Sequence, residues 1–366
     1  MPQHADDCTN FIKDSNSFKH LEKEYEKFGA ASGSKINHGK TEILQIGNWR
    51  GNNPGLPPHL IKEKVKALGV YFGKEQIKEN LQNMKKKLKI NIDIWAQTPL
   101  CIMERAQVAK TYFYSNMNYI LKAMDLNHTT LKNLDKEIIN YIWGNKLHYL
   151  EKETLYKENK KWGLAIPNLI KKQEAIMLNG FKKIKSNPDM PWEGLYIYWY
   201  GFNIKNRIDI FRNNLLTKKL QIPYKFRLIK DVLLKFKENK EMWEEDSNTY
   251  KKIRDHYCKN LRCKVERGNW GVNWTMTWTN WMNIKSLKIQ SIIYKYLHDV
   301  WLTGEIATKM KMIKRTPMCP LCKKYTFSKR HLITECVKTK IEREEIIKEI
   351  RQNETYNRNQ ILYLDT

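Results

Sequence analysis

Four metal-ligating residues recur late in the chain at the spacing of a small zinc module. Cys319 and Cys322 form a Cys-Pro-Leu-Cys knuckle, and His331 and Cys336 follow, giving the pattern Cys-x2-Cys-x8-His-x4-Cys. Two thiolates, an imidazole and a further thiolate make up the tetrahedral ligand set that zinc prefers. Because protein ligands fill all four positions, the pattern predicts a structural zinc that helps a short segment to fold. The alternative is four unrelated residues.

Basic residues surround these ligands. Lys323, Lys324, Lys329 and Arg330 lie between the knuckle and the later ligands. They are candidates for contact with phosphate groups, and a solvated basic face is an equal alternative.

The charge of the whole chain also favours a polyanionic partner. Lys and Arg number 66 against 39 Asp and Glu in 366 residues, a net charge of +27. This excess favours RNA or DNA first and an anionic membrane surface second, against a basic surface with no specific partner. No apolar run has the length of a membrane span and the first residues are polar, so we expect no membrane partner and a nuclear or cytoplasmic location. In such a compartment the seven cysteines are thiols or metal ligands.

The hydrophobic pattern predicts a mixed N-terminal region. Residues 15–30 carry apolar side chains at helical spacing, with glycines at the end of the segment. Short strands are predicted over residues 42–46 and 65–72. A loop rich in Gly, Asn and Pro separates them at residues 47–58.

Beyond residue 76 the pattern becomes helical. Between residues 76 and 182 one clean helical face is formed by Leu131, Leu134, Ile138 and Ile142. Residues 183–300 mix helices with many Trp and Tyr. The segment after Cys336 predicts one more amphipathic helix, with its apolar side formed by Val337, Ile341, Ile346, Ile347 and Ile350.

Two further clusters have a functional and a structural interpretation. Trp270, Trp274, Trp278 and Trp281 recur every three or four residues. On a helix they form a stripe that stacks on unpaired bases or, as such stripes do more often, packs in the core. A second group, His256, Cys258 and Cys263, lacks a fourth ligand at finger spacing, and core or surface thiols are the better interpretation.

Adjacent carboxylates stand almost at the first residue of the sequence. Asp6 and Asp7 occur in the segment Gln-His-Ala-Asp-Asp-Cys. Magnesium prefers hard oxygen ligands, and a tight hairpin that presents carboxylates supplies some of them. Taken alone, two acidic residues are more often an ordinary solvated turn.

Several motifs then follow one another in order. They are Ala-Asp-Asp at 5–7, Gly-Ser-Lys-Ile-Asn-His-Gly-Lys-Thr at 33–41, Leu-Gly at 68–69, Trp95, Pro99, Leu100, Glu104, Arg105 and Lys110, Tyr-Ile-Trp-Gly at 141–144, and Trp-Gly-Leu-Ala-Ile-Pro-Asn-Leu at 162–169. This series resembles the second half of the palm and the thumb of LINE-type non-LTR retrotransposon reverse transcriptases. The Cys/His cluster is similar to the zinc-binding tail of those proteins. His4 departs from the family, which usually has an aromatic residue before Ala-Asp-Asp, and residues 183–265 match nothing in it.

The resemblance implies an α+β, mostly helical fold. Its expected parts are a truncated palm remnant at 1–75, a thumb-like helical domain at 76–182, a helical connecting region at 183–300 and a zinc-binding module at 301–366. It also implies that Asp6 and Asp7 are catalytic magnesium ligands. The nucleic-acid-binding positions that it implies are Lys35, Lys40, Leu68, Gly69, Arg105 and Lys110. For Lys35 and Lys40, ordinary surface lysines are the alternative.

The family's fingers, first catalytic Asp and template grip lie before the acidic turn. We therefore expect no primer extension by this chain alone, and extension that is lost in Asp6→Ala would contradict this. Three functions remain open. The chain is an inactive, retroelement-derived protein that binds RNA or DNA, a polymerase component that needs the missing half from another chain, or a zinc-stabilised module that binds a protein. Zinc is expected as a structural ion in all three, and magnesium only in a competent polymerase.

Overall fold

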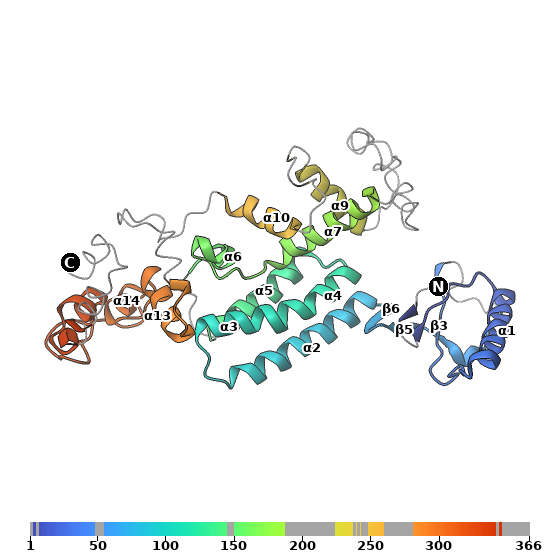
Figure 1. The fold of residues 1–366 in the computed structure, drawn as a ribbon, viewed down its shortest axis with the longest axis horizontal. Coiled ribbons are helices and arrows are strands. Elements are labelled where there is room, and N and C mark those ends of the chain that lie inside the picture. The colour runs from blue at the N-terminus through green and yellow to red at the C-terminus, as the bar shows by residue number, and fades with distance from the viewer. Residues whose placement is uncertain are drawn as a thin grey trace. The chain divides into compact units, whose positions relative to one another are not determined.

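The chain is mostly helical with minor strands, as the sequence predicts (Figure 1). The computed structural model describes residues 3–4, 7–47, 55–144, 150–186, 224–236, 239, 242, 248–259, 281–341 and 344–345. The chain divides into two compact units, Met1–Ile90 and Asn91–Thr366, and their boundary falls within one long helix.

The first unit opens with a short hairpin and a helix. Strands β1 (Gln3–His4) and β2 (Asp7–Cys8) pair antiparallel, with His4 opposite Asp7. Helix α1 (Ser15–Ser32) confirms the helix predicted over residues 15–30. The Asp14 carboxylate accepts the Ser17 N–H at 2.8 Å and caps its start, whereas Gly33, at φ 74°, ends it. None of its side chains is buried.

The remaining strands of this unit are short. Strand β3 (Ile43–Leu44) confirms the strand predicted at 42–46 and pairs parallel with β4 (Ile61–Lys62), which follows a 3-10 turn at Pro58–Leu60. The single strand predicted over 65–72 is wrong. It is a hairpin of β5 (Lys64–Ala67) and β6 (Val70–Gly73), joined by a two-residue turn.

This turn explains the error. Leu68 and Gly69 both have positive φ, 48° and 82°, as a type I′ hairpin turn requires. Helix α2 (Gln76–Ala96) holds the hairpin: the Asn80 side chain donates to the Tyr71 carbonyl at 2.7 Å and accepts the Tyr71 N–H at 2.9 Å.

A helical core forms the centre of the second unit. Helix α3 (Ile102–Val108) continues through a π turn at Ala109–Tyr114 into α4 (Ser115–Ala123). Helix α5 (His128–Ile142) packs against α3 and α7 (Leu169–Ser186). The predicted face of α5 is confirmed as core, because Leu131, Leu134, Ile138 and Ile142 are at most 1% exposed. The connection holds helix α6 (Lys152–Tyr156) and a 3-10 turn at Asn159–Lys161.

One buried carboxylate links these elements. Asp135 on α5 accepts the Tyr114 hydroxyl at 3.0 Å, the Tyr156 hydroxyl at 3.4 Å and the Leu169 N–H at 3.2 Å. Burial raises the pKa of Asp135 to about 7, although these hydrogen bonds oppose the shift.

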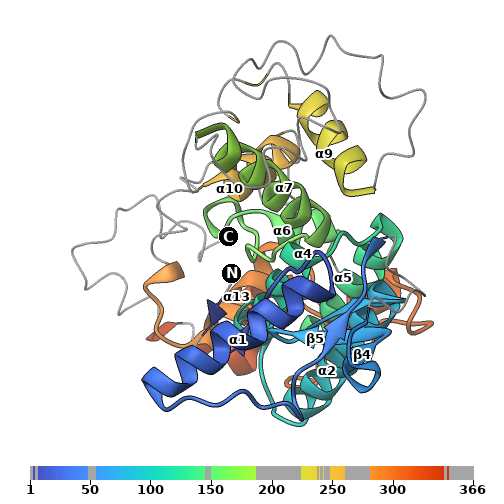
Figure 2. The ribbon, with the colours of Figure 1, turned by 90° about the vertical axis from the view of Figure 1, so that its right-hand side faces the viewer.

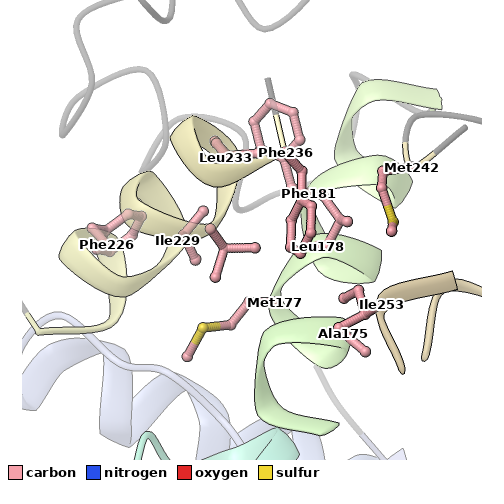
Figure 3. Close-up of a cluster of buried hydrophobic side chains, with 11 residues drawn as sticks. Ala175, Met177, Leu178, Phe181, Phe226, Ile229, Leu233, Phe236, Met242 and Ile253 are labelled. Atoms are coloured by element: carbon pink, nitrogen blue, oxygen red, sulfur yellow. The ribbon is translucent and has the colours of Figure 1, made fainter. Parts of the chain in front are cut away.

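A second apolar cluster extends this core. Helices α9 (Tyr224–Lys235) and α10 (Thr249–Cys258) both pack against α7 (Figure 2). Figure 3 shows the buried side chains between them, among them Phe181, Ile229 and Phe236. Helices α9 and α10 of the region 183–300 are thus built onto α7.

Helix α13 (Leu287–Leu297) packs against α3, and its Ser291 hydroxyl accepts the Met103 N–H at 3.3 Å. Trp281 is 4% exposed and stacks on Trp162 and Tyr294, with ring centroids 5.6 and 6.0 Å away. Trp281 is therefore a core residue, and the other three members of the predicted stripe lie outside the described residues.

The C-terminal module consists of short elements. Helix α14 (Gly304–Lys309) is followed by a π turn at His331–Glu335 and a 3-10 turn at Val337–Thr339. Of the helix predicted after Cys336, Val337 and Ile341 are exposed, and the other three apolar positions lie outside the described residues.

Candidate metal centre

The first two ligands lie on a small backbone knuckle. Met318 and Thr326 form an antiparallel bridge, and the Cys319 N–H donates to the Tyr325 carbonyl at 2.6 Å. Between these arms, Lys323 has a φ of 56° and donates its N–H to the Cys319 carbonyl at 2.8 Å. This tight reversal brings the Cys319 and Cys322 thiols to the same side of the turn.

The other two ligands are presented by the π turn. The Cys336 N–H donates to the His331 carbonyl at 2.7 Å, a bond that spans five residues. Since this bond brings residues five apart into register, the spacing His-x4-Cys places the His331 and Cys336 side chains on the same side of the turn. The Ser328 hydroxyl caps the turn by accepting the His331 N–H at 3.0 Å.

These turns bring all four predicted ligands together. One ligand atom from each of Cys319, Cys322, His331 and Cys336 lies within 4.8 Å of the others. The Cys319 and Cys336 Sγ atoms are 4.0 Å apart, and Cys322 Sγ is 3.2 Å from His331 Nε2. Zn–S bonds of about 2.3 Å in a tetrahedron require ligand separations of roughly 3.8 Å, so the group fits zinc.

Burial and hydrogen bonding suit the same role. Cys319 and Cys336 are fully buried, His331 is almost so, and Cys322 is half-buried. The N–H groups of Lys324 and Tyr325 lower the pKa of the Cys322 thiol to about 6, which favours the thiolate that binds metal. A zinc bound here has four protein ligands, so it stabilises the module and leaves no position for a substrate.

Glu335 was not predicted and lies behind one ligand. Its carboxylate accepts from Arg330 Nε at 2.8 Å, and its other oxygen is 3.8 Å from His331 Nδ1. This distance is longer than a hydrogen bond, and Nδ1 has no hydrogen-bond partner among the described residues; a carboxylate that closes this gap orients a metal-bound imidazole. The sequence signal was an acidic residue directly before the last ligand, which is too common to single out.

The four basic residues around the ligands differ in their surroundings. Arg330 pairs with Glu335, and Lys329 pairs with Asp299 at 3.3 Å and lies over the Tyr296 ring. Lys323 and Lys324 are exposed, and neither has an ion pair with any residue that the structure describes.

The positions assigned to polymerase chemistry lie elsewhere. Asp6 is outside the described residues, and Asp7 lies in β2. Lys35 and Lys40 are exposed in the loop after α1, and Leu68 and Gly69 form the hairpin turn. All belong to the first compact unit.

Arg105 and Lys110 belong to the second unit and are half-buried. The Arg105 guanidinium packs against Gly144, which has a φ of 68° and where a side chain would overlap it. Lys110 Nζ donates to the Leu164 carbonyl at 3.3 Å, and burial lowers its pKa. Each residue thus contacts another of the segments in the ordered series, 141–144 or 162–169.

The poorer cysteine cluster is not a metal site among the described residues. Cys258 is buried, the His256 ring packs 5.5 Å from the Phe236 ring, and Cys263 is outside the described residues. Where the structure describes the chain, only the Cys319 group could hold a metal ion.

None of the described helices is both long enough and apolar enough to span a bilayer. No protein-family model matches the chain.

Proposed function

We propose that this chain is a zinc-stabilised protein that binds RNA or DNA through charge. The observation that carries the proposal is a run of exposed lysines on α2: Lys85, Lys86, Lys87 and Lys89. None of them has an ion pair with a described residue. Some other surface lysines are neutralised locally, as in the Lys27–Glu24 and Lys309–Glu305 pairs at 2.8 and 2.7 Å.

Local neutralisation matters because binding to nucleic acid is driven by counterion release. Each phosphate that a free cation neutralises adds about 0.9 to the slope of log affinity against log salt on a duplex. A lysine that already holds a carboxylate must give up that pair first. The unpaired run on α2 is thus the stronger source of phosphate contacts.

The test compares two variants of equal net charge. Lys85, Lys86, Lys87 and Lys89 are changed together to Gln in one variant. In the other, Gln replaces four lysines that pair with Glu24, Glu63, Glu75 and Glu305, namely Lys27, Lys74, Lys78 and Lys309. Each lowers the net charge of +27 by four units, to +23. Binding of a labelled RNA hairpin and a DNA duplex is measured across a salt series. We expect the α2 variant to lose most of about 4 × 0.9 in slope, and the paired-lysine variant much less.

Equal losses in both variants would show that only net charge matters and would remove the α2 run as the binding element. Salt-independent binding, or no binding at low salt, would contradict the proposed function and favour a protein-binding module.

We further propose descent from LINE-type reverse transcriptases. The support is the ordered series of motifs, together with the Leu68–Gly69 turn at the tip of a hairpin beside Lys66. The activity proposed for this chain is binding without independent polymerisation. It is tested by primer extension on RNA with magnesium, with and without a polypeptide that carries the family's other half of the palm. Extension by the chain alone that is lost in Asp6→Ala would contradict it.

A further inference from the structure

The zinc knuckle carries an aromatic ring on its surface. Tyr325 is 58% exposed, and Leu321 in the same turn is 48% exposed. Trp281, the aromatic residue first considered for base stacking, is only 4% exposed and lies within a stack of rings. Of these two, only Tyr325 offers a ring face to a ligand.

The metal ligands hold this ring in place. The Tyr325 carbonyl accepts the Cys319 N–H at 2.6 Å, and its own N–H donates to the Cys322 sulfur. The Tyr325 ring lies 5.1 Å from the His331 ring, centroid to centroid. Three of the four metal ligands thus fix one exposed tyrosine. A ring that is already ordered loses little conformational entropy when it binds.

Two free cations accompany the ring. Lys323 and Lys324 immediately precede Tyr325, are exposed, and have no ion pair with a described residue. We call Leu321, Lys323, Lys324 and Tyr325 the knuckle patch. Its charge suits a polyanion, and its ring and apolar side chain suit a flat, uncharged group. A single strand of RNA or DNA carries both, whereas a duplex keeps its base faces stacked inside.

We propose that the knuckle patch binds an unpaired stretch of nucleic acid, with one base stacked on Tyr325 and the flanking phosphates beside Lys323 and Lys324. This rests on the proposed function and specifies single-stranded nucleic acid as the ligand at the zinc module.

The test uses the full chain and three probes: labelled oligothymidylate, an abasic strand with the same number of phosphates, and a DNA duplex. Tyr325→Ala is expected to weaken binding of oligothymidylate about 5- to 150-fold, the range for losing one stacked base. Tyr325→Phe, which keeps the ring, is expected to stay within about twofold of wild type. Tyr119→Ala removes a tyrosine of similar exposure on α4 and is the matched control.

The probes separate stacking from charge. Wild type is expected to bind oligothymidylate more tightly than the abasic strand, and Tyr325→Ala to lose most of that preference. Duplex binding is expected to be unchanged in Tyr325→Ala. Unchanged affinity of Tyr325→Ala for oligothymidylate, with zinc retained, would overturn the knuckle patch and leave the lysine-driven binding standing. Wild type that binds none of the three at low salt would overturn both proposals.

If Tyr325→Ala loses its zinc, crosslinking of the wild-type protein still tests the knuckle patch. A strand that carries 5-iodouracil is irradiated on the protein, and the crosslinked peptides are identified by mass spectrometry. A crosslink at Tyr325 is expected. Crosslinks only outside residues 318–325 would contradict the proposal.

Discussion

Helix α5 and the C-terminal module bury different kinds of side chain. On α5, Leu131, Leu134, Ile138 and Ile139 are all fully buried. In the module, large apolar side chains are exposed by 38% or more: Met310, Met312, Ile313, Met318, Leu321, Tyr325, Val337 and Ile341. Its buried side chains include instead three of the four metal ligands, Cys319, His331 and Cys336.

The difference shows two ways to stabilise a fold in one chain. Burying one Leu or Ile contributes about 1.5–3 kcal/mol, and α5 does this repeatedly. The module has few such contributions. Binding of structural zinc has an apparent free energy of about 10–16 kcal/mol in small zinc modules, and that energy is available only to the folded ligand set. We therefore expect the module, and not the α5 core, to depend on metal.

Removal of one zinc ligand is expected to have the largest effect. Cys319→Ser leaves three ligands and should reduce the zinc content from one per chain to near zero, because a structural site loses its tetrahedral set. Zinc is measured by elemental analysis of the purified protein. Cys258→Ser, which changes a buried cysteine outside the group, should keep its zinc. Equal zinc in Cys319→Ser and wild type would show that the metal is bound elsewhere.

A cavity in the α5 core should lower the stability of the core without affecting the zinc content. Leu134→Ala removes a fully buried side chain and should lower the free energy of unfolding by about 2–5 kcal/mol, with zinc content unchanged. Denaturant unfolding followed by circular dichroism measures this. Leu234→Ala, at a position 47% exposed on α9, should cost no more than about 0.5 kcal/mol. Loss of zinc in Leu134→Ala would show that the two regions do not depend on separate interactions.

The buried Asp135 should make the core sensitive to pH. Its pKa rises from 3.8 to about 7 on folding, so the folded state holds a proton that the unfolded state releases. Its contribution to the free energy of unfolding is thus complete below about pH 4 and declines as the pH rises toward 7. The slope of this contribution against pH cannot exceed about 1.4 kcal/mol per pH unit, the value for the release of one proton.

Asp135→Asn removes this titration. The free energy of unfolding of wild type should therefore fall, relative to that of Asp135→Asn, as the pH rises from 4 to 7. Denaturant titrations at several pH values measure it, and Asp93→Asn, at an exposed position on α2, is the control. A constant difference across that range would contradict a protonated, buried Asp135.

The smallest effect is expected at Glu335. Glu335→Gln removes the charge near His331 Nδ1 and the ion pair with Arg330, and should weaken zinc binding up to about tenfold. Competition with a chromophoric chelator measures the affinity. Glu305→Gln, which breaks the exposed pair with Lys309, is the control and should leave zinc affinity unchanged. An unchanged affinity in Glu335→Gln would show that the carboxylate does not position the imidazole.

The sequence predicts these two regions through different signals. The face of α5 is visible because its apolar period is long and regular, and the zinc ligands because Cys-x2-Cys-x8-His-x4-Cys is a rare spacing. The Leu68–Gly69 turn is not visible, since Leu at positive φ carries no turn signal and apolar residues continue on both sides. The roles of Asp135 and Tyr325 depend on which distant groups contact them: three donors enclose Asp135, whereas Tyr325 remains 58% exposed.

The most direct test of a metal-dependent module beside an apolar core is hydrogen exchange on wild type with and without a zinc chelator. Peptides from residues 301–341 and from residues 128–142 are followed in the same sample by mass spectrometry. We predict that chelation removes one zinc per chain and abolishes protection around residues 319–336, whereas α5 keeps its protection. Protection around 319–336 that persists in metal-free protein, or that is lost together with protection of α5, would contradict the account.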